Sequence, residues 1–461
     1  MTSPLNDSRL WWARWGVLLL LAMASFLAYL TRHSLAVANT TIQKELGIDN
    51  EQFGLLYGAF SLGYMILQVP GGWMGQKLGV RLALPFMAVL WSLTTFATAF
   101  MSTFAGLLVI RFLFGLAQAG LVPNQALVVR DWIADAGRGV ASAVMVVAMS
   151  VGSIASLSLT SWLLRDFPWR SIIVGYSTLG VLWAVVFAFL FRSTPQQVRW
   201  LRRVDEESPS ESWAGLATFQ TRADTNDLCA KIELQTASAP AAGSESRMQN
   251  VLRLLSRPGM WGLSVQALLK ASAYNLTVTF LPALLEYIHG VPPQEAGALV
   301  TWSLVAFIGG TMLGGVFVDR VYRWTGSKFY SRSGLAAAML VLAGVFTAIA
   351  GDTDSAAATA AWLTVAALFS GLASAAPWVA VMDIGGRNTA VVMGVMNSFS
   401  ALGGVLLSPL VGKLIDFTKA THGDWNRVFW LHAGFYLMAA ACWLAVDPDR
   451  SLETSGVTHA V

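Results

Sequence analysis

Long apolar blocks separated by short polar segments are the feature that most constrains how this chain folds. A membrane-spanning helix needs about 20 mainly apolar residues, and twelve blocks of the 461-residue chain are that long. Only 12% of the residues are charged, about half the share found in soluble domains, which excludes an ordinary soluble enzyme and a disordered chain. The expected spans are residues 13–38, 51–71, 82–101, 104–129, 139–163, 170–192, 258–288, 296–318, 333–350, 356–382, 389–415 and 427–446.

This pattern predicts an all-α integral membrane protein with twelve transmembrane helices in two six-helix halves. Residues 1–192 form the expected first half, residues 258–461 the second half with a short tail, and residues 193–257, the one long polar stretch, a cytoplasmic linker. Cytoplasmic segments of membrane proteins are enriched in Lys and Arg. With both termini in the cytoplasm, the short cytoplasmic segments hold twelve of these residues and the opposite side six. Both termini are therefore predicted to be cytoplasmic.

A short motif recurs once in each half. Residues 72–81 read GWMGQKLGVR after the second expected span, and residues 315–320 read GVFVDR after the eighth, 243 residues later. The glycine lets two helices approach closely, and the basic residue anchors a cytoplasmic helix end. Secondary transporters are built from internal repeats of this kind. The gating candidates in the two copies are Gln76, Lys77, Arg81, Asp319 and Arg320.

Three cations fall inside expected spans without an evident acidic partner. Arg32, Arg111 and Lys270 lie within apolar blocks, whereas none of the 26 acidic residues lies in the middle of one. A charge at mid-bilayer costs about 2.5–3.5 kcal/mol on insertion scales, so unpaired cations indicate an anion supplied from outside. The alternatives are that Arg32 snorkels to the outer surface, that Arg111 bonds to the backbone or to Gln118, and that Lys270 pairs with a neighbouring helix end.

The repeat also places two expected helices opposite each other. With the 243-residue offset, Thr31 corresponds to Tyr274 and Arg32 to Asn275, and Lys270 lies more than one helical turn from Asn275. An anion with two charged or polar ends can then bridge Arg32 and the region of Lys270 and Asn275. Arginine gives bidentate recognition of a carboxylate, and lysine a point charge.

At the motif copies the chain resembles the major facilitator superfamily, in which Gly-x-x-x-Asp-Arg/Lys-x-Gly follows helix two. Gln76 stands where the Asp is usual, whereas the second copy keeps Asp319. Because that Asp helps to latch the two halves on the cytoplasmic side, the resemblance predicts a weaker latch in the first half. Outside the linker, the chain is similar to the anion:cation symporter family, which includes bacterial hexuronate, galactonate, glucarate and phthalate carriers and has animal lysosomal and vesicular organic-anion carriers as relatives. The matching segments are YLTRHSLAVA from residue 29, QVPGG from 68, RFLFGLAQ from 111, DIGG from 383 and GVMN from 394.

The resemblance implies a multi-pass carrier of a small organic anion, a sugar acid or an aromatic acid, in the cell membrane of a bacterium, working by alternating access. No enzymatic step, cofactor, metal or nucleic acid is expected; the expected partners are the anion, a proton or counter-anion and the bilayer, and a monomer is expected. The alternatives are a carrier of another substrate class (an exporter or a zwitterion carrier) and a sensor on a transporter fold. By resemblance, Tyr29, Arg32, Tyr64, Trp378 and Asn397 match positions that contact sugar-acid substrates, and Lys270, Tyr274, Asn275 and Ser398 complete the candidate site.

The coupling of transport to an ion is left open by two departures from the family. Proton-coupled members usually have Asp-Arg in helix one and Glu at the end of the helix-four motif, where this chain has Thr31-Arg32 and Gln118. Neither Thr nor Gln titrates, and His33 is the nearest titratable group. Three modes remain: proton symport through His33 or through the substrate's own proton, anion exchange or facilitated diffusion, and a different co-ion. The coupling candidates are Thr31, His33, Arg111 and Gln118.

Overall fold

The computed structural model describes residues 4–192, 256–421 and 423–449, and in these ranges the regular structure is helical, without strands. Ten helical stretches are long and apolar enough to cross a membrane, so length and composition alone do not confirm twelve spans. Two features of the second half account for the difference. The expected span 258–288 is broken by a π-helical turn, and the expected spans 356–382 and 389–415 run together in one stretch, Ala356–Ala420.

The first bundle of helices runs from α1 to α8. The expected span 104–129 is divided here into two helices at Gly120, where the backbone passes close to Gly71 of another helix and the Met87 side chain fills the remaining space. Pro123 stands near the start of the second piece, where a missing N–H is tolerated. The helices are α1 (Pro4–Val37), α2 (Asn39–Leu46), α3 (Asn50–Leu78), α4 (Val80–Thr98), α5 (Phe104–Gln118), α6 (Leu121–Trp132), α7 (Arg138–Leu163) and α8 (Trp169–Leu190).

The second bundle runs from α12 to α19. Of the predicted linker 193–257, only the last two residues lie in the described part of the chain. The helices are α12 (Pro258–Asn275), a π-helical turn (Leu276–Phe280), α13 (Leu281–His289), α14 (Pro293–Thr325), a second π-helical turn (Tyr330–Gly334), α15 (Leu335–Gly351), α16 (Ala356–Leu372), α17 (Ala376–Gly385), α18 (Thr389–Ala420) and α19 (Asn426–Cys442).

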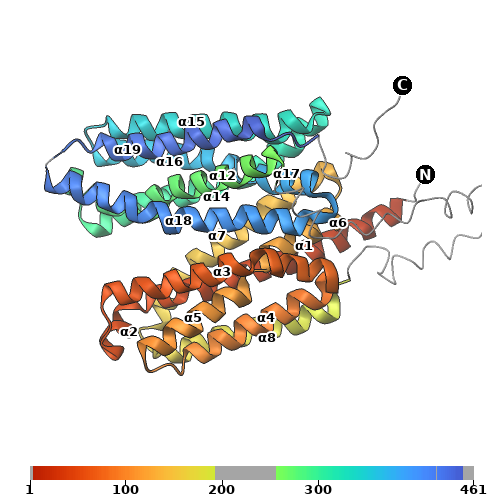
Figure 1. The fold of residues 1–461 in the computed structure, drawn as a ribbon, viewed down its shortest axis with the longest axis horizontal. Helices are drawn as coiled ribbons and strands as arrows, with labels where there is room; N and C mark the ends of the chain where they lie inside the picture. Colours follow the sequence, from red (N-terminus) through yellow and green to blue (C-terminus); the bar gives the residue numbers. More distant parts are fainter. Residues whose placement is uncertain (1–3, 193–255, 422, 450–461) are drawn as a thin grey trace, which may run out of the picture.

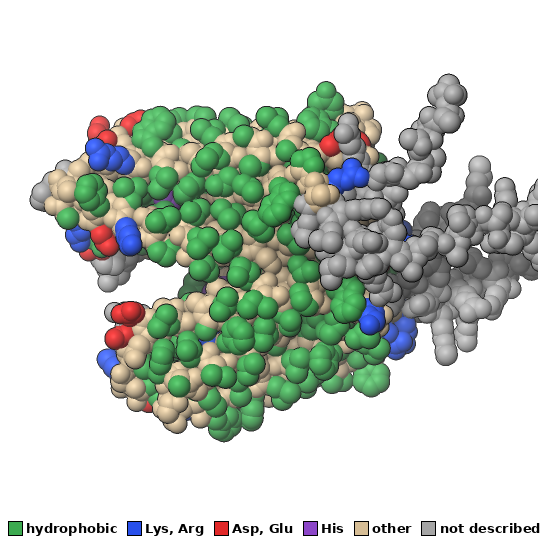
Figure 2. All heavy atoms as spheres, viewed as in Figure 1, with side chains coloured by type: hydrophobic (Ala, Val, Ile, Leu, Met, Phe, Trp, Pro, Cys, Tyr) green, Lys and Arg blue, Asp and Glu red, His purple; other side chains and the backbone are tan. Residues whose placement is uncertain are grey.

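The two bundles lie side by side, and α1 begins at the same end of the molecule at which α19 finishes (Figure 1). We call this the closed end. At the opposite end, the open end, the surface is hollowed by a cleft between the bundles (Figure 2). Contacts between the bundles are made mainly by α3 with α18 and by α7 with α14.

Glycines at the closed end bring helices of opposite bundles into backbone contact. A Cβ added to Gly315 of α14 would lie 2.6 Å from the carbonyl oxygen of Gly139 in α7, and one added to Gly72 of α3 would lie 2.7 Å from that of Ala390 in α18. Neither position has room for a larger residue while the helices stay in place. The predicted close approach at Gly72 and Gly315 is confirmed, and it joins the bundles at the closed end.

Candidate functional site

Arg32 lies in a cage of aromatic rings in the first bundle. Its guanidinium carbon is 4.3 Å from the ring centroid of Tyr29, 4.8 Å from that of Phe60 and 4.6 Å from that of Tyr64. Its Nε donates a hydrogen bond of 2.9 Å to Oε1 of Gln118. Every one of these partners is uncharged. The site therefore fixes the guanidinium in position without neutralising it, and the side chain stays partly exposed.

Gln118 accepts a hydrogen bond from Arg32. The alternative that Gln118 is the hydrogen-bond partner of Arg111 is therefore wrong. The buried amide also donates through Nε2 to the carbonyl oxygen of Ala28 at 2.9 Å, so it is fixed from both sides. Arg111 lies two turns away on α5, only 6% exposed, with an Nε that has no hydrogen-bond partner in the described structure. Its guanidinium carbon is 5.3 Å from the Phe114 ring centroid. Arg111 is thus a second cation for which the described ranges contain no ion-pair partner.

The two neighbours of Arg32 in the sequence face different surroundings. Thr31 is buried, and its hydroxyl lies 3.0 Å from carbonyl oxygens of the preceding turn of α1. It is occupied by its own helix and is not a cavity ligand. The His33 ring centroid lies 5.9 Å from that of Tyr29, within electrostatic range of both Arg32 and Arg111. The side chain of His33 therefore belongs to this cationic region and does not point away from it.

Lys270 of α12 is the candidate cation of the second bundle, five residues before Asn275, the repeat equivalent of Arg32. Its Nζ donates a hydrogen bond of 2.8 Å to Oγ of Ser374, which in turn donates to the carbonyl oxygen of Ser370 at 3.0 Å. One turn further along α12, the Tyr274 ring centroid lies 4.5 Å from that of Phe307. In the described ranges, no carboxylate forms an ion pair with Lys270. A hydroxyl is the polar partner of this ammonium group.

Polar contacts join the bundles beside the aromatic cage. Asn397 of α18 donates through Nδ2 to the hydroxyl of Tyr64 in α3 at 3.1 Å, and Ser398 donates to the carbonyl oxygen of Met65 at 3.1 Å. Tyr64 thus contacts Arg32 with its ring and the second bundle with its hydroxyl. The structure brings together the predicted residues Arg32, Tyr64, Asn397 and Ser398 at the boundary between the bundles.

The remaining predicted substrate residues have no hydrogen bond or ring contact with the aromatic cage in the described part of the structure. Tyr274 packs against Phe307 of its own bundle and has no hydrogen bond or ring contact to the first bundle among the described residues. Trp378 of α17 is buried in the hydrophobic core. Asn275 is the last residue of α12, and its side chain lies outside the described part of the structure.

The two motif copies each tie the bundles together at the closed end, with different chemistry. In the second copy, the Asp319 carboxylate accepts hydrogen bonds from the backbone N–H groups of Gly139 at 2.8 Å and Val140 at 2.9 Å, in the first turn of α7. In the first copy, Gln76 donates through Nε2 to the carbonyl oxygen of Arg387 at 2.5 Å. Charge-assisted bonds are about twice as strong as neutral ones. The first copy has one neutral bond, and the second has two charge-assisted bonds.

The basic residues of the motif copies do not join the bundles through any contact seen in the described residues. Lys77 and Arg320 are exposed and lie over tryptophan rings of their own helices, Lys77 at 4.9 Å from the Trp73 centroid and Arg320 at 4.8 Å from the Trp324 centroid. Arg81 is exposed at the start of α4. Lys77 and Arg81 lie at helix ends and Arg320 in the second-last turn of α14, and their anchoring role stays a prediction.

Sequence reasoning missed a buried ionic cluster around Asp383 at the closed end. The Asp383 carboxylate accepts a hydrogen bond from Arg332 Nε at 2.9 Å and lies 3.1 Å from Lys328 Nζ, and Arg138 of the first bundle approaches to 3.7 Å. The Asp383 and Arg332 side chains are fully buried. A carboxylate at the end of an apolar block was the one available signal, because the cations come from two segments of the chain, Lys328 and Arg332 from one and Arg138 from the other, that are distant from Asp383 in the sequence.

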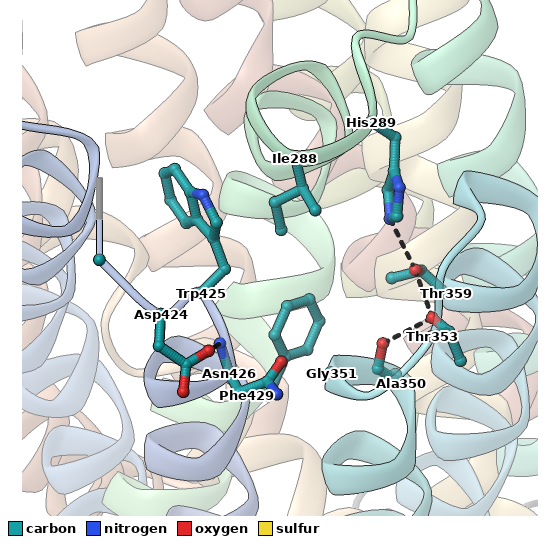
Figure 3. A pocket seen from close by; sticks show the side chains of 11 residues that line it. Ile288, His289, Ala350, Gly351, Thr353, Thr359, Asp424, Trp425, Asn426 and Phe429 are labelled. Atoms are coloured by element: carbon teal, nitrogen blue, oxygen red, sulfur yellow. Dashed lines mark hydrogen bonds between the residues drawn. The ribbon is translucent and has the colours of Figure 1, made fainter.

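A separate pocket of about 270 Å³ lies at the open end of the second bundle, between α13, α15, α16 and the start of α19 (Figure 3). His289 lies 3.0 Å through Nε2 from the hydroxyl of Thr359, which lies 2.7 Å from that of Thr353. Trp425 and Phe429 form apolar walls. The lining residues all belong to the second bundle and include none of the predicted site residues, so this pocket is not the site between the bundles.

Comparisons with known proteins agree with this architecture. The sequence model of the Major Facilitator Superfamily matches residues 21–408. The chain is 25% identical over 452 residues to "Probable sulfoacetate transporter SauU" of Cupriavidus necator, covering 96% of this chain and 97% of the relative. It is 25% identical over 427 residues to "Probable galactarate/D-glucarate transporter GudP" of Bacillus subtilis, covering 89% and 87%. Among solved structures, the proton:xylose symporter XylE has a TM-score of 0.68 at 15% identity over 95% of both chains.

Proposed function

We propose a transport cycle from the premise that this chain belongs to the major facilitator superfamily. It is a multi-pass membrane transporter of small organic anions, not an enzyme. The proposal adds which residues hold the anion, which end of the molecule faces which side, and which anions fit. It rests on one observation: Arg32 in the first bundle and Lys270 in the second are held by neutral partners alone in the described structure.

In the proposed site, a carboxylate of the substrate binds the edge of Arg32 that Gln118 leaves free. Gln118 uses the Nε of the guanidinium, and the Tyr29 and Tyr64 side chains also interact with the guanidinium. Because a guanidinium has five N–H donors, donors at the Nη edge remain for a carboxylate. The other end of the anion reaches Lys270 in the opposite bundle. Tyr64 and Asn397, which already bridge the bundles by a hydrogen bond of 3.1 Å, would line the space between the two cations. Binding one molecule from both bundles favours closure of the cleft around it.

The proposed membrane arrangement has twelve spans, with α12 and α13 together forming one broken span. The halves are residues 1–192 and 258–461, joined by the linker 193–257. The excess of Lys and Arg near the closed end supports a cytoplasmic closed end with both termini in the cytoplasm. The structure is then the outward-open state, and transport requires the contacts of Gln76, Asp319 and Asp383 to separate as the cleft closes.

The substrate class proposed for the chain is small, polar and acidic. The relatives named above are called transporters of sulfoacetate and of galactarate or glucarate, molecules that carry carboxylate or sulfonate groups on a short polar frame. An exporter of cations is disfavoured, because the cleft residues described above include no acid. The aromatic cage of Arg32 also suits an anion, since it leaves the positive charge of the guanidinium uncompensated.

The test is uptake of radiolabelled organic acids into liposomes that contain the purified protein. Wild-type protein should take up at least one sugar acid or sulfonated acid, and Arg32→Ala should abolish this uptake while the protein stays folded. Arg32→Lys should largely fail, because a point charge replaces the bidentate fork. The matched control is Arg165→Ala, which removes an exposed arginine outside the site. Thermal stabilisation by neutral or cationic compounds alone, or normal uptake by Arg32→Ala, would contradict the proposal.

A further inference from the structure

We propose that the site selects dianions over monoanions and that Lys270 is the residue that sets this preference. The inference rests on the proposed anion transport at the same site and names the class of anion. Two cations belong to the proposed site. A simple carboxylic acid supplies only one anionic group to pair with them.

The proposed site has one cation from each bundle, and no ion pair of the described residues neutralises either of them. Arg32 is hydrogen-bonded to an amide, and Lys270 to the hydroxyl of Ser374. Thr31 cannot serve as an acidic partner, and its hydroxyl is turned to its own helix. In the described ranges, no ion pair reaches either cation. The protein therefore presents two fixed positive groups to whatever enters the cleft.

Each cation also keeps donors free for a ligand. A guanidinium has five N–H donors and an ammonium has three. Arg32 uses its Nε on Gln118 and also interacts with Tyr29 and Tyr64, which together occupy at most three of its five donors, and Lys270 uses one donor on Ser374. The two groups lie on opposite bundles, which meet at the hydrogen bond between Tyr64 and Asn397. A ligand with an anionic group at each end fits this arrangement better than a ligand with one.

Closure of the cleft increases the preference. A charge that is buried without a partner is strongly unfavourable, whereas a charge that is buried with a hydrogen-bonded counter-charge is tolerated. A bound monoanion would leave one of the two cations uncompensated when water leaves the cleft, and a dianion would leave neither. Arg111 lies two turns along α5 from Gln118, about 10 Å along the helix axis, so it is not counted as a direct ligand. Its positive charge adds to that of Arg32 and favours a dianion in the same sense.

The experiment compares acids of matched shape that differ by one charge. Glucarate is paired with gluconate, which has the same six-carbon polyol chain and one carboxylate fewer, and sulfoacetate is paired with isethionate. Binding is measured by thermal shift and by inhibition of uptake in liposomes. For at least one pair, the dianion should bind about tenfold to a hundredfold more tightly, the range of a hydrogen bond to a charged group.

Lys270→Met removes the charge and keeps a flexible side chain of similar length. In this variant the Kd values of the dianion and the monoanion of a pair should lie within about threefold of each other, because only the dianion binds more weakly. Lys270→Arg should keep the preference for the dianion. The matched control is Lys413→Met, which removes an exposed lysine from the same bundle. This control should leave the preference at the wild-type value, which separates a local contact from a change in net charge.

The outcomes separate the two proposals. If no organic anion stabilises the protein or enters liposomes, both the proposed function and the dianion preference are wrong. If monoanions bind as tightly as their dianion partners to the wild-type protein, anion transport stands and the dianion preference is wrong. If the wild-type preference survives in Lys270→Met, Lys270 is not the residue that sets it. The wild-type comparison decides the first two outcomes even if Lys270→Met does not fold.

Discussion

Replacing the neutral partner of Arg32 by an acid tests the electrostatics of the site most directly. In Gln118→Glu, an oxygen that now accepts from Arg32 Nε at 2.9 Å would become part of a carboxylate. The side chain is fully buried, and its other contact, to the carbonyl oxygen of Ala28, would lose its N–H donor. The introduced charge would compete with the substrate for the guanidinium.

The size of the effect follows from the distance between two like charges. A substrate carboxylate on the Nη edge of Arg32 would lie roughly 6 Å from the introduced carboxylate, and at an effective dielectric constant of about 20 such charges repel by about 2.8 kcal/mol. This corresponds to a loss of about a hundredfold in affinity. When the introduced carboxylate takes a proton, the repulsion disappears. The affinity of Gln118→Glu should therefore fall as the pH rises, whereas that of the wild type should change much less.

The measurement is the Kd of the best-binding acid in both proteins from acidic to neutral pH. Gln125→Glu is the matched control, because Gln125 is also fully buried and bonds to α1, through Leu21 and Ser25, without an arginine. It should lower stability without making Kd depend on pH. A Kd for Gln118→Glu within about twofold of the wild-type value at neutral pH would refute the proposed position of the substrate, and so would a weakening that is equal at every pH.

Two further predictions concern positions away from the cleft. Gly315→Val should destabilise the state in which the closed end is shut by about 1–3 kcal/mol, because its Cβ would meet Gly139. The opposite, open end should then close more often, so electron spin resonance between labels on α2 and α13 should show a shorter separation. An unchanged distance distribution would contradict this. The indole N–H of Trp169 and the guanidinium of Arg170 hold the pKa of Glu45 below its usual value. This contribution to stability is complete above a pH of about 4.3 and is lost as the pH falls through the lowered pKa. The Tm of Glu45→Gln should therefore decrease less than that of the wild type as the pH falls. Identical plots of Tm against pH for the two proteins would argue against this.

The helices of the first half were predictable because the signal for a span is local. Each apolar block contains its own evidence, so the spans around α1, α3, α4, α7 and α8 follow from a window of about 20 residues. The break between α12 and α13 was not predicted. The segment Leu276–Phe280 is mainly apolar and β-branched, and nothing in its composition distinguishes a π-helical turn from a continuous helix.

The cations of the site were predictable for the same reason, and their partners were not. A charge in an apolar block is visible in the sequence, which is why Arg32, Arg111 and Lys270 could be named. Gln118, however, is 86 residues from Arg32, and Ser374 is 104 residues from Lys270. Which polar group reaches a given cation depends on how distant helices pack, and one sequence does not state this.

The neutral residues beside Arg32 also affect the step in which the empty carrier returns from the inward-facing to the outward-facing state. A carrier with an acid at such a position can neutralise its arginine internally once the substrate has left. Here Gln118 holds the guanidinium at the same charge whether the site is full or empty. Closing the empty cleft would bury Arg32 and Lys270 without a counter-charge, which is costly. A bound dianion removes this cost in either direction, and a monoanion removes part of it, so the arrangement favours exchange of one anion for another over return of the empty carrier.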